Sequence, residues 1–385
     1  MANELLTPDA IAAETLVRMD DNLAATQLFH RDFEPEFNGS VKVGDTIKIK
    51  KPVVVEAKEF DRAQGIEIQD VKVSTVDLTI EKHFDVSYSI TTKELSMEMN
   101  DFANDFVVPA VVAISEKIEN YIQSKYIEIP NAIGTPGAPP DSIADLMQIG
   151  AYLTHWKVPL SNRIGLVDPF TAAALGSSGD LMRADAIADA GRALREAEIG
   201  RKGGINWYTS RLVNQHTAGS LTNGTIRGGK VKANALKGAS AFTVTDTSLT
   251  GAIVVGDVFT IAGAVDFKGK PIWFTVTAAA TASANDVAVA FYPALPADVS
   301  ANAVVTFAAD HTANIVGHPF GLTYALVTPD LPLNTGQRAA SLNYRGLGIR
   351  VVYGYDMNKK DNIISFDTMV GAKVIQPELL SRLFG

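Results

Sequence analysis

Cysteine is absent from all 385 residues of this chain. Structural disulfides, thiolate metal sites and cysteine nucleophiles are therefore excluded. No run of residues approaches the roughly 18 apolar positions of a membrane-spanning helix. The opening stretch, "MANELLTPDAIAAETLVRMDDNL", is acidic and lacks the basic and apolar regions of a secretory signal. These absences predict a soluble chain that folds in a reducing cytoplasm and has no membrane partner.

A basic surplus is also missing, because the formal net charge is −9 and the pI lies near 5.2. Dedicated nucleic-acid-binding proteins usually carry such a surplus, so nucleic-acid binding is not expected to be the main task. The hydrophobic fraction of 46% and the charged fraction of 20% are ordinary for globular proteins. They leave enough apolar material for two or three domains.

Recognisable catalytic and cofactor motifs are missing as well. The stretch "GTIRGGKV" at 224–231 approaches a phosphate-binding loop, but Val231 replaces the hydroxyl residue and no helix pattern follows, so we interpret it as a glycine-rich loop. "RGLGIR" lacks the third glycine of a dinucleotide fingerprint, no G-x-S-x-G elbow occurs, and the six histidines show no metal-ligand spacing. The sequence therefore predicts a protein that is not an enzyme and needs no cofactor or metal.

The first structural signals are a helix and a ribbon. Thr7 and Pro8 suit the N-cap and first position of a helix over about 8–28. Residues 41–73 follow as the two arms of a hairpin, in which apolar residues alternate with polar ones from Val41 to Val55. An isolated two-stranded ribbon is marginal in water, and this one has too little apolar face to pack on its own chain. It predicts either a solvated hairpin or an arm that pairs with another subunit.

Charged side chains are dense along this ribbon. The basic run "KIKK" at 48–51 is compatible with a minor phosphate contact or with a simple exposed ribbon. The candidates for contact with another subunit are Lys48, Lys50, Lys51, Lys58, Glu59, Asp61 and Arg62.

Two very long elements follow the ribbon. "VDLTIEKHFDVSYSI" at 76–90 alternates strictly and predicts one strand of roughly 45 Å. Residues 93–128 then keep helical spacing, with a stripe that shifts after Pro109 to Val111, Ile114, Ile118 and Ile122, so the proline should kink or restart the helix. Such elements are typical of an extended tile in a shell rather than of a compact monomeric enzyme.

The remaining sequence reads as an α/β region interrupted by a block of strands. Asp141 or Ser142 should cap a helix to about Trp156, "NRIGLVDP" is a short buried strand, and Asp168 caps a further helix. Residues 183–198 read as helical and "GGINWYTSRLV" as a strand. Short strands at 242–246, 252–255, 258–262, 271–277, 286–291 and 303–308 then predict a small barrel or sandwich within 222–318. Helical and mixed signals return at 319–385, including "ELLSRLFG", so the block resembles an insertion into a split domain.

Three stretches carry a resemblance to a known family. "SNRIGLVDPFTAAAL" with "GGINWYTSRLV", the turn-containing "VVGDVFTIAGAV", and "DNIISFDTMVGAKVIQPELLSRL" resemble parts of the major capsid protein of tailed bacteriophages. The order of parts resembles the Hong-Kong-97 capsid fold, and the inserted block resembles that of the short-tailed Salmonella-phage coat type. The resemblance rests on order and pattern over nearly the whole chain.

The resemblance implies an α+β fold with an inserted small all-β barrel. Its parts would be an N-terminal arm (1–35), an extended loop (36–74), a peripheral domain with a spine helix (75–135), an α/β axial domain (136–221 and 319–385) and the insertion domain (222–318). Within the insertion, "IRGGKVKANALKG" at 226–238 is the candidate intersubunit loop, with Arg227, Lys230 and Lys232 as its contact residues.

The implied function is self-assembly into the icosahedral shell of a virion, in the host bacterial cytoplasm. The partners would be further copies in pentamers and hexamers, a scaffolding protein, a portal, and packaged double-stranded DNA held by weak non-specific contact. An encapsulin-like nanocompartment shell is the main alternative. An enzyme with a small β-module and a surface adhesin or carbohydrate-binding protein are two further alternatives, weakened by the missing catalytic motifs and the missing secretion signal.

Overall fold

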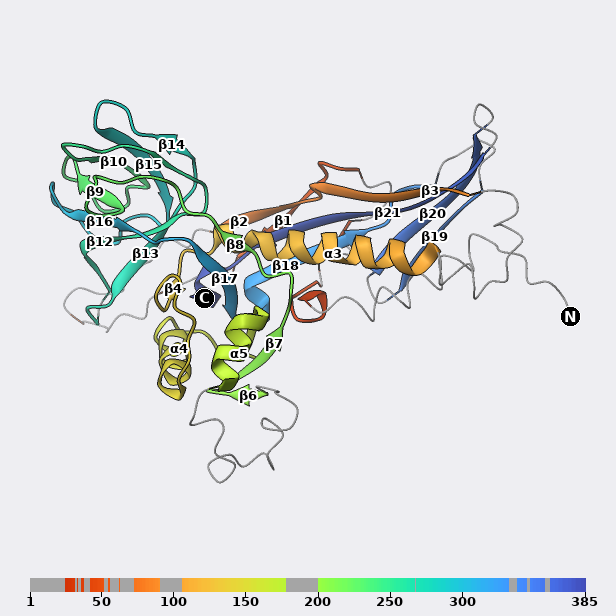
Figure 1. The fold of residues 1–385 in the computed structure, drawn as a ribbon, viewed down its shortest axis with the longest axis horizontal. Helices are drawn as coiled ribbons and strands as arrows, with labels where there is room; N and C mark the ends of the chain where they lie inside the picture. The colour runs from red at the N-terminus through yellow and green to blue at the C-terminus, as the bar shows by residue number, and fades with distance from the viewer. Residues whose placement is uncertain are drawn as a thin grey trace, which may run out of the picture. The chain divides into compact units, whose positions relative to one another are not determined.

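The computed structural model describes residues 25–31, 33, 36–37, 42–51, 55, 62, 73–90, 106–177, 200–266, 268–331, 338–344, 347–356 and 361–385 (Figure 1). The chain forms two compact units. The first unit contains residues 1–22, 30–117 and 323–376, and the second contains 23–29, 118–322 and 377–385. The early and late parts of the chain therefore share one unit, and the middle forms most of the other.

A five-stranded sheet forms the core of the first unit. The long strand β21 pairs with both β20 and β3, and its residues Ile364, Phe366 and Val370 are completely buried. Alternation along β3 matches the predicted period of two, because Phe84, Val86 and Tyr88 are half-buried while their neighbours are exposed. The strands are β3 (Lys82–Ile90), β18 (Leu322–Val327), β19 (Arg338–Tyr344), β20 (Leu347–Asp356) and β21 (Asp361–Val374).

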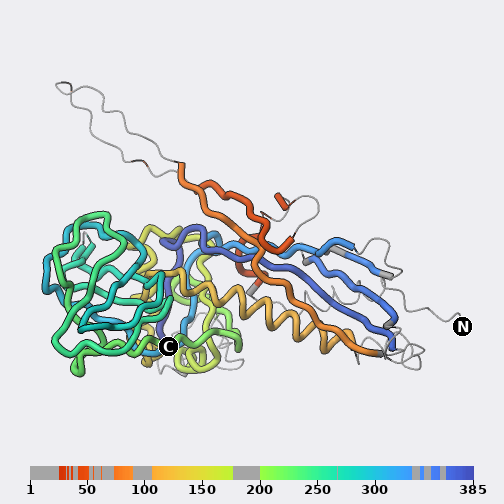
Figure 2. Tube along the Cα trace, turned by 90° about the horizontal axis from the view of Figure 1, so that it is seen from above, coloured from red at the N-terminus to blue at the C-terminus, as the bar shows by residue number. Residues whose placement is uncertain are grey.

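The base of the ribbon corrects the predicted hairpin. Strand β1 (Thr46–Lys50) pairs antiparallel with β2 (Thr75–Thr79) (Figure 2). Most of β2 belongs to the segment 76–90, which the sequence predicted as one long strand, and not to the second arm of the hairpin. That long strand is interrupted at 80–81, where the pairing changes from β1 to β21. Periodicity alone could not reveal this break, because the alternation continues through it without a change of phase.

The ribbon base also packs on its own chain, contrary to the prediction that it could not. Ile49 and Leu78, on the same face of the two strands, are 4% and 0% exposed. They join Ile80, Met369 and Ile375 in one apolar cluster of the first unit. The base is therefore a folded part of the subunit.

Helix α3 (Val108–Ser124) confirms the predicted apolar stripe, because Val111, Ile114, Ile118 and Ile122 are all buried. A π-helical turn at 106–107 precedes it, and Pro109 is its second residue. Proline is tolerated there because the first turn has no internal acceptor for its missing N–H. A short 3-10 helix, η5 (Lys125–Glu128), continues from its end.

A mixed seven-stranded sheet organises the second unit, in which β5 runs parallel to β7 and antiparallel to β17. Both predicted helix caps are present. The Ser142 hydroxyl accepts from the Asp145 N–H at the start of α4 (Ile143–His155), and Asp168 accepts from two N–H groups of α5 (Pro169–Ser177). The strands are β4 (Ala132–Ile133), β5 (Ile164–Val167), β6 (Arg201–Lys202), β7 (Ile205–Thr209), β8 (Gln215–His216), β17 (His311–Gly317) and β22 (Leu380–Phe384).

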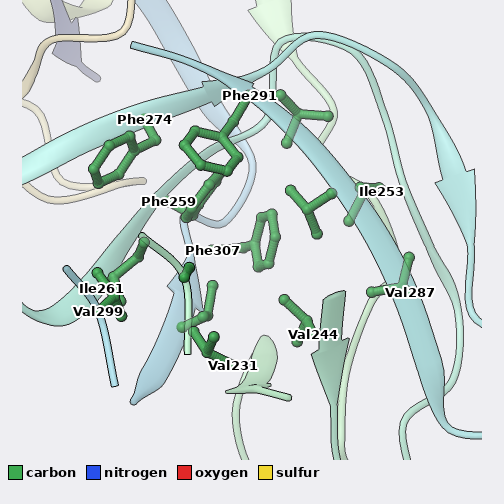
Figure 3. Close-up of a cluster of buried hydrophobic side chains, with 14 of the residues drawn as sticks. Val231, Val244, Ile253, Phe259, Ile261, Phe274, Val287, Phe291, Val299 and Phe307 are labelled. Carbon is green, nitrogen blue, oxygen red and sulfur yellow. The ribbon is translucent and has the colours of Figure 1, made fainter. Parts of the chain in front are cut away.

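The predicted small all-β block is a closed six-stranded barrel with its own apolar core (Figure 3). Phe259 contacts Phe274, Phe291 and Phe307 with ring centroids 5.0–5.7 Å apart. The barrel strands, in spatial order, are β10 (Ala241–Thr245), β15 (Asp286–Tyr292), β13 (Pro271–Val276), β12 (Val258–Val265), β16 (Val304–Phe307) and β9 (Gly228–Val231). Two further short strands, β11 (Ala252–Ile253) and β14 (Ala280–Thr281), pair with each other and form a separate two-stranded sheet.

The end of "GTIRGGKV" is a strand, which corrects the interpretation of that stretch as a loop. A Cβ on Gly228 would stand 2.0 Å from the Val305 carbonyl oxygen, and φ there is +139°. Only glycine allows β9 to approach β16 this closely. The glycines therefore serve barrel closure, not phosphate binding.

Two expectations for the later part of the chain are wrong in detail. Residues 311–317 form β17 of the seven-stranded sheet and are not part of the barrel. Most of 319–376 forms strands of the first unit, and "ELLSRLFG" is a 3-10 turn, η7 (Pro377–Leu379), followed by strand β22. Pairing with strands that are distant in the sequence decides which sheet these segments join, and local residue patterns contain no information about such partners.

Some predicted elements lie outside the described residues. These are most of the helix expected over 8–28, the part of the long helix at 93–105, and the helix at 183–198. Within the first of them, the described residues Ala25–Gln27 form a 3-10 helix, η1.

Candidate assembly surfaces and the buried junction

The exposed face of the ribbon base is polar and carries charges of both signs. Lys48 and Lys50 of β1 are exposed, and Lys48 lies directly opposite Asp77 of β2. The hydroxyl oxygens of Thr46 and Thr79 are 2.8 Å apart on the same pair of strands. One face is thus fixed in the subunit core while the other presents a cross-strand pair of opposite charges to solvent.

The connection between β1 and β2 spans residues 51–74, far longer than the two to five residues of common hairpin loops. Its ends are close, because the Lys51 N–H donates to the Ser74 carbonyl oxygen at 2.9 Å. Lys51 is half-buried and Arg62 is exposed. Lys58, Glu59 and Asp61 lie outside the described residues.

The three barrel candidates have different surroundings. The guanidinium of Arg227 is half-buried and donates to the Gly219 carbonyl, so it has a role inside the subunit. Lys232 pairs with Asp286 at 2.5 Å, and this hydrogen bond lowers the pKa of that carboxyl. Lys230 is exposed on β9. Lys230 is thus the candidate whose side chain is most available to another molecule.

The loop that follows Lys232 holds an apolar side chain outward. Ala235 exchanges two backbone hydrogen bonds with Val299, and the Gly238 N–H donates to the Leu295 carbonyl. Leu236 lies between these anchors and is 69% exposed. The predicted contact residues of this loop are all basic, whereas its most exposed large apolar side chain is Leu236.

Beneath the barrel, a buried arginine joins it to the seven-stranded sheet. Arg382 of β22 is completely buried, and Leu380 and Phe384, two residues away on either side in the same strand, are buried apolar residues. Its guanidinium donates to the carbonyl of Gly256 at 2.6 Å and to the Thr275 hydroxyl at 3.1 Å, both in the barrel. Further bonds reach the carbonyls of Ile127 and Ile129 at the end of η5.

A chain of polar side chains surrounds this arginine. The Tyr126 hydroxyl lies 2.9 Å from Nδ1 of His216, and Nε2 of His216 lies 2.9 Å from Asp257 Oδ1. The Asp257 carboxylate also accepts from the N–H groups of Gly219 and Val254. His311 packs on His216 with ring centroids 5.1 Å apart. We call Tyr126, His216, Asp257, His311 and Arg382 the buried junction.

Burial governs the titration of the buried junction. It raises the pKa of Tyr126, so the phenol stays protonated and can donate to His216. It lowers the pKa of His311 to about 4, so that imidazole is neutral at neutral pH. Because Tyr126 and His311 are neutral, the positive charge of buried Arg382 is balanced by one nearby carboxylate, that of buried Asp257.

Three outer contacts also join the barrel to the rest of the second unit. His155 of α4 pairs with Asp266 at the β12–β13 turn, and Lys270 lies 5.8 Å from the centroid of the Tyr152 ring. The Tyr292 hydroxyl donates to Glu378 at 3.1 Å. Together with the buried junction, these contacts hold the barrel on the rest of the second unit.

Sequence reasoning missed the buried junction because its members lie far apart, from residue 126 to residue 382. One signal was available. The stretch "VVGDVFTIAGAV" contains a turn at Gly256-Asp257, and an aspartate in such a turn is a candidate for accepting hydrogen bonds from nearby backbone N–H groups. Nothing local showed that Arg382 or the two histidines would meet it.

Two further functional features, a metal site and a membrane-spanning helix, are not found in the described part of the chain. No group of three or more histidine, aspartate or glutamate side chains there is placed to hold a metal ion. Among the described helices, none combines the length and apolarity needed to cross a membrane.

Comparisons with known proteins give likeness only at the level of structure, since no family model and no curated protein matches the sequence. A structure from Mycobacterium phage Che8 shares 13% identity at a TM-score of 0.49, covering 94% of this chain and 90% of that one. The capsid structure of cyanophage P-SCSP1u shares 10% identity at 0.46, covering 90% and 84%. A virus-like particle from Pyrococcus furiosus shares 8% identity at 0.41, covering 97% and 98%. The likeness is broad, but these identities and TM-scores are too low to establish a shared family.

Proposed function

We propose that this chain is a major capsid protein, which assembles with copies of itself into the icosahedral shell around the double-stranded DNA genome of a tailed bacteriophage. The single observation that carries the proposal is the ribbon. Its base is anchored in the subunit through Ile49 and Leu78, and a long charged connection leaves from that base. Because the base is already fixed in its own subunit, less conformational entropy is lost when the connection contacts another copy.

The arrangement of the chain supports the same function. A ribbon, a strand and a helix come first, and an α/β sheet interrupted by a closed barrel follows. This is the order of parts that the resemblance to tailed-phage coat proteins implies. Each contact between copies can be weak in such a shell, because closure multiplies many contacts. Scaffolding protein, portal and loosely held DNA are the further partners that this function requires.

A nanocompartment shell that encloses a cargo protein is the second candidate, because it would use the same subunit chemistry. The closed barrel favours the phage coat, since the insertion is a feature of the coat type that the sequence resembles. Under either function, the chain has a structural role.

The test replaces residues 52–73 by Asn-Gly, which joins Lys51 to Ser74 through a tight turn. The hydrogen bond between these residues shows that the shortened chain can close without moving Ile49. We expect soluble subunits with unchanged circular dichroism and no closed particles by electron microscopy. Wild-type protein, expressed with and without its neighbouring genes, should form shells or tubes of uniform wall thickness. Normal shells from the shortened protein would contradict the proposal.

A further inference from the structure

The buried junction contains two neighbouring histidines whose hydrogen bonds differ. Both histidines are buried, with His216 3% and His311 2% exposed. His216 is satisfied as a neutral ring, because Nδ1 can accept from the Tyr126 hydroxyl while the Nε2 proton is donated to Asp257. This tautomer follows from the pattern of hydrogen bonds.

His311 has one partner and one bare nitrogen. Its Nδ1 lies 2.8 Å from the Ala309 carbonyl oxygen, which can only accept, so Nδ1 carries the proton of the neutral ring. Its Nε2 is buried and has no hydrogen-bond partner among the described residues. The ring stands edge-on to Phe384, with centroids 4.4 Å apart. A second proton on Nε2 would therefore enter a buried site that offers it no acceptor among the described residues.

The charges that face His311 oppose that proton as well. Arg382 disfavours a positive imidazole, and Asp257, which already accepts from His216 and two backbone N–H groups, favours it. Tyr126 is neutral, and Asp310 has an exposed side chain that accepts from the Ala218 N–H. The surroundings thus contain one buried negative charge, which is already balanced by Arg382.

We propose that the buried junction is an acid-sensitive lock, which holds the barrel on the seven-stranded sheet and releases it when His311 becomes protonated. Protonation adds an uncompensated charge beside Arg382, whose bonds to Gly256 and Thr275 hold the barrel. Moving the barrel away admits water and lets the imidazolium be solvated. The inference concerns the single subunit and does not depend on the proposed function.

The sign of the pH dependence follows from linkage. Burial lowers the pKa of His311 from 6.5 to about 4, so between these values the released state binds more protons than the locked state. The lock is at full strength above about pH 6.5, weakens as the pH falls, and loses the whole contribution of His311 below about pH 4.

The test uses Trp273, which packs edge-on against Phe384 where the barrel meets the sheet, with ring centroids 5.6 Å apart. Its emission is isolated by Trp156→Phe and Trp207→Phe in the full-length, unassembled chain. We expect a red shift with a midpoint between pH 4 and 6.5, without loss of far-ultraviolet circular dichroism. His311→Leu should move this midpoint at least one pH unit lower or abolish the shift, whereas the matched control His83→Gln, at a histidine in the other unit, should leave it unchanged.

A second measurement keeps the proposal open to refutation if the variants fold poorly. Histidine NMR of the wild-type chain should show the His311 ring titrating together with a change in Trp273 or its neighbours. An unchanged midpoint in His311→Leu, or a His311 ring that titrates near pH 6.5 with no structural change, would overturn the lock.

Discussion

The guanidinium of Arg382 lies 5.1 Å from the centroid of the Tyr126 ring, at the point where the barrel, the seven-stranded sheet and the end of η5 meet. The ring face stabilises the cation, and carbonyl oxygens and a hydroxyl satisfy its N–H groups. A charge with this many donors can connect three elements, which no apolar side chain of similar size can do.

Arg382→Met should lower the free energy of unfolding by about 3–5 kcal/mol, because Asp257 is then a buried charge without its counter-charge. Urea unfolding followed by tryptophan fluorescence measures this directly, since Trp156, Trp207 and Trp273 all lie in the second unit. Arg201→Met, at an exposed position of the same unit, should change the value by less than about 0.5 kcal/mol. Equal effects from both substitutions would refute the central role of Arg382.

Leu78→Ala should destabilise the first unit by about 2–5 kcal/mol, because it removes a completely buried side chain from the core beneath the ribbon. Circular dichroism during urea unfolding is the suitable probe, since this unit contains no tryptophan. Val43→Ala, at a residue that is 51% exposed, is the matched control and should have little effect. A harmless Leu78→Ala would mean that the ribbon base contributes nothing to subunit folding.

Gly228→Ala should cost about 1–3 kcal/mol through overpacking, because the new methyl group would collide with the Val305 carbonyl on the neighbouring barrel strand. Gly176→Ala provides the contrast. Its Cβ would meet nothing within 4 Å on helix α5, so alanine there should stabilise the chain by up to about 1 kcal/mol. Thermal unfolding of the two variants should therefore shift in opposite directions.

Asp367→Asn should destabilise the five-stranded sheet by about 3 kcal/mol, because the buried carboxylate accepts from Arg350 in a two-pronged pair and from His83 at 3.1 Å. Asparagine leaves the arginine without its counter-charge. Circular dichroism during urea unfolding is the measurement, with Asp77→Asn on the exposed face of β2 as the control. A loss no larger than that of the control would show that the pair adds nothing to stability.

The sequence predicted best those features that depend on neighbours along the chain. Ser142 and Asp168 cap their helices because the bonds they make are only two or three residues away. The stripe of α3 and the short strands of the barrel follow from side-chain periodicity in the same way.

Features that depend on distant partners could not be predicted. The alternation around Ile80 continues smoothly, although the strand changes partner there. The spacing of Leu380, Leu383 and Phe384 is also helical, yet β22 forms because β17 offers it a place in the sheet. Among the candidate contact residues, the sequence could not show that Arg227 and Lys232 are engaged within their own subunit.

The pairing of β3 with β21 has a consequence for synthesis. His83 and Asp367 are 284 residues apart, so translation at about 5–20 residues per second separates their emergence by roughly 15–60 s. Throughout that interval the middle of the chain, with its barrel, can fold while β3 waits for its neighbour. Met369 and Ile375 close the core under the ribbon equally late. A nascent chain therefore completes the core under its ribbon base only after residue 375 has emerged, so the ribbon is without its fixed base for most of the time in which the barrel can fold.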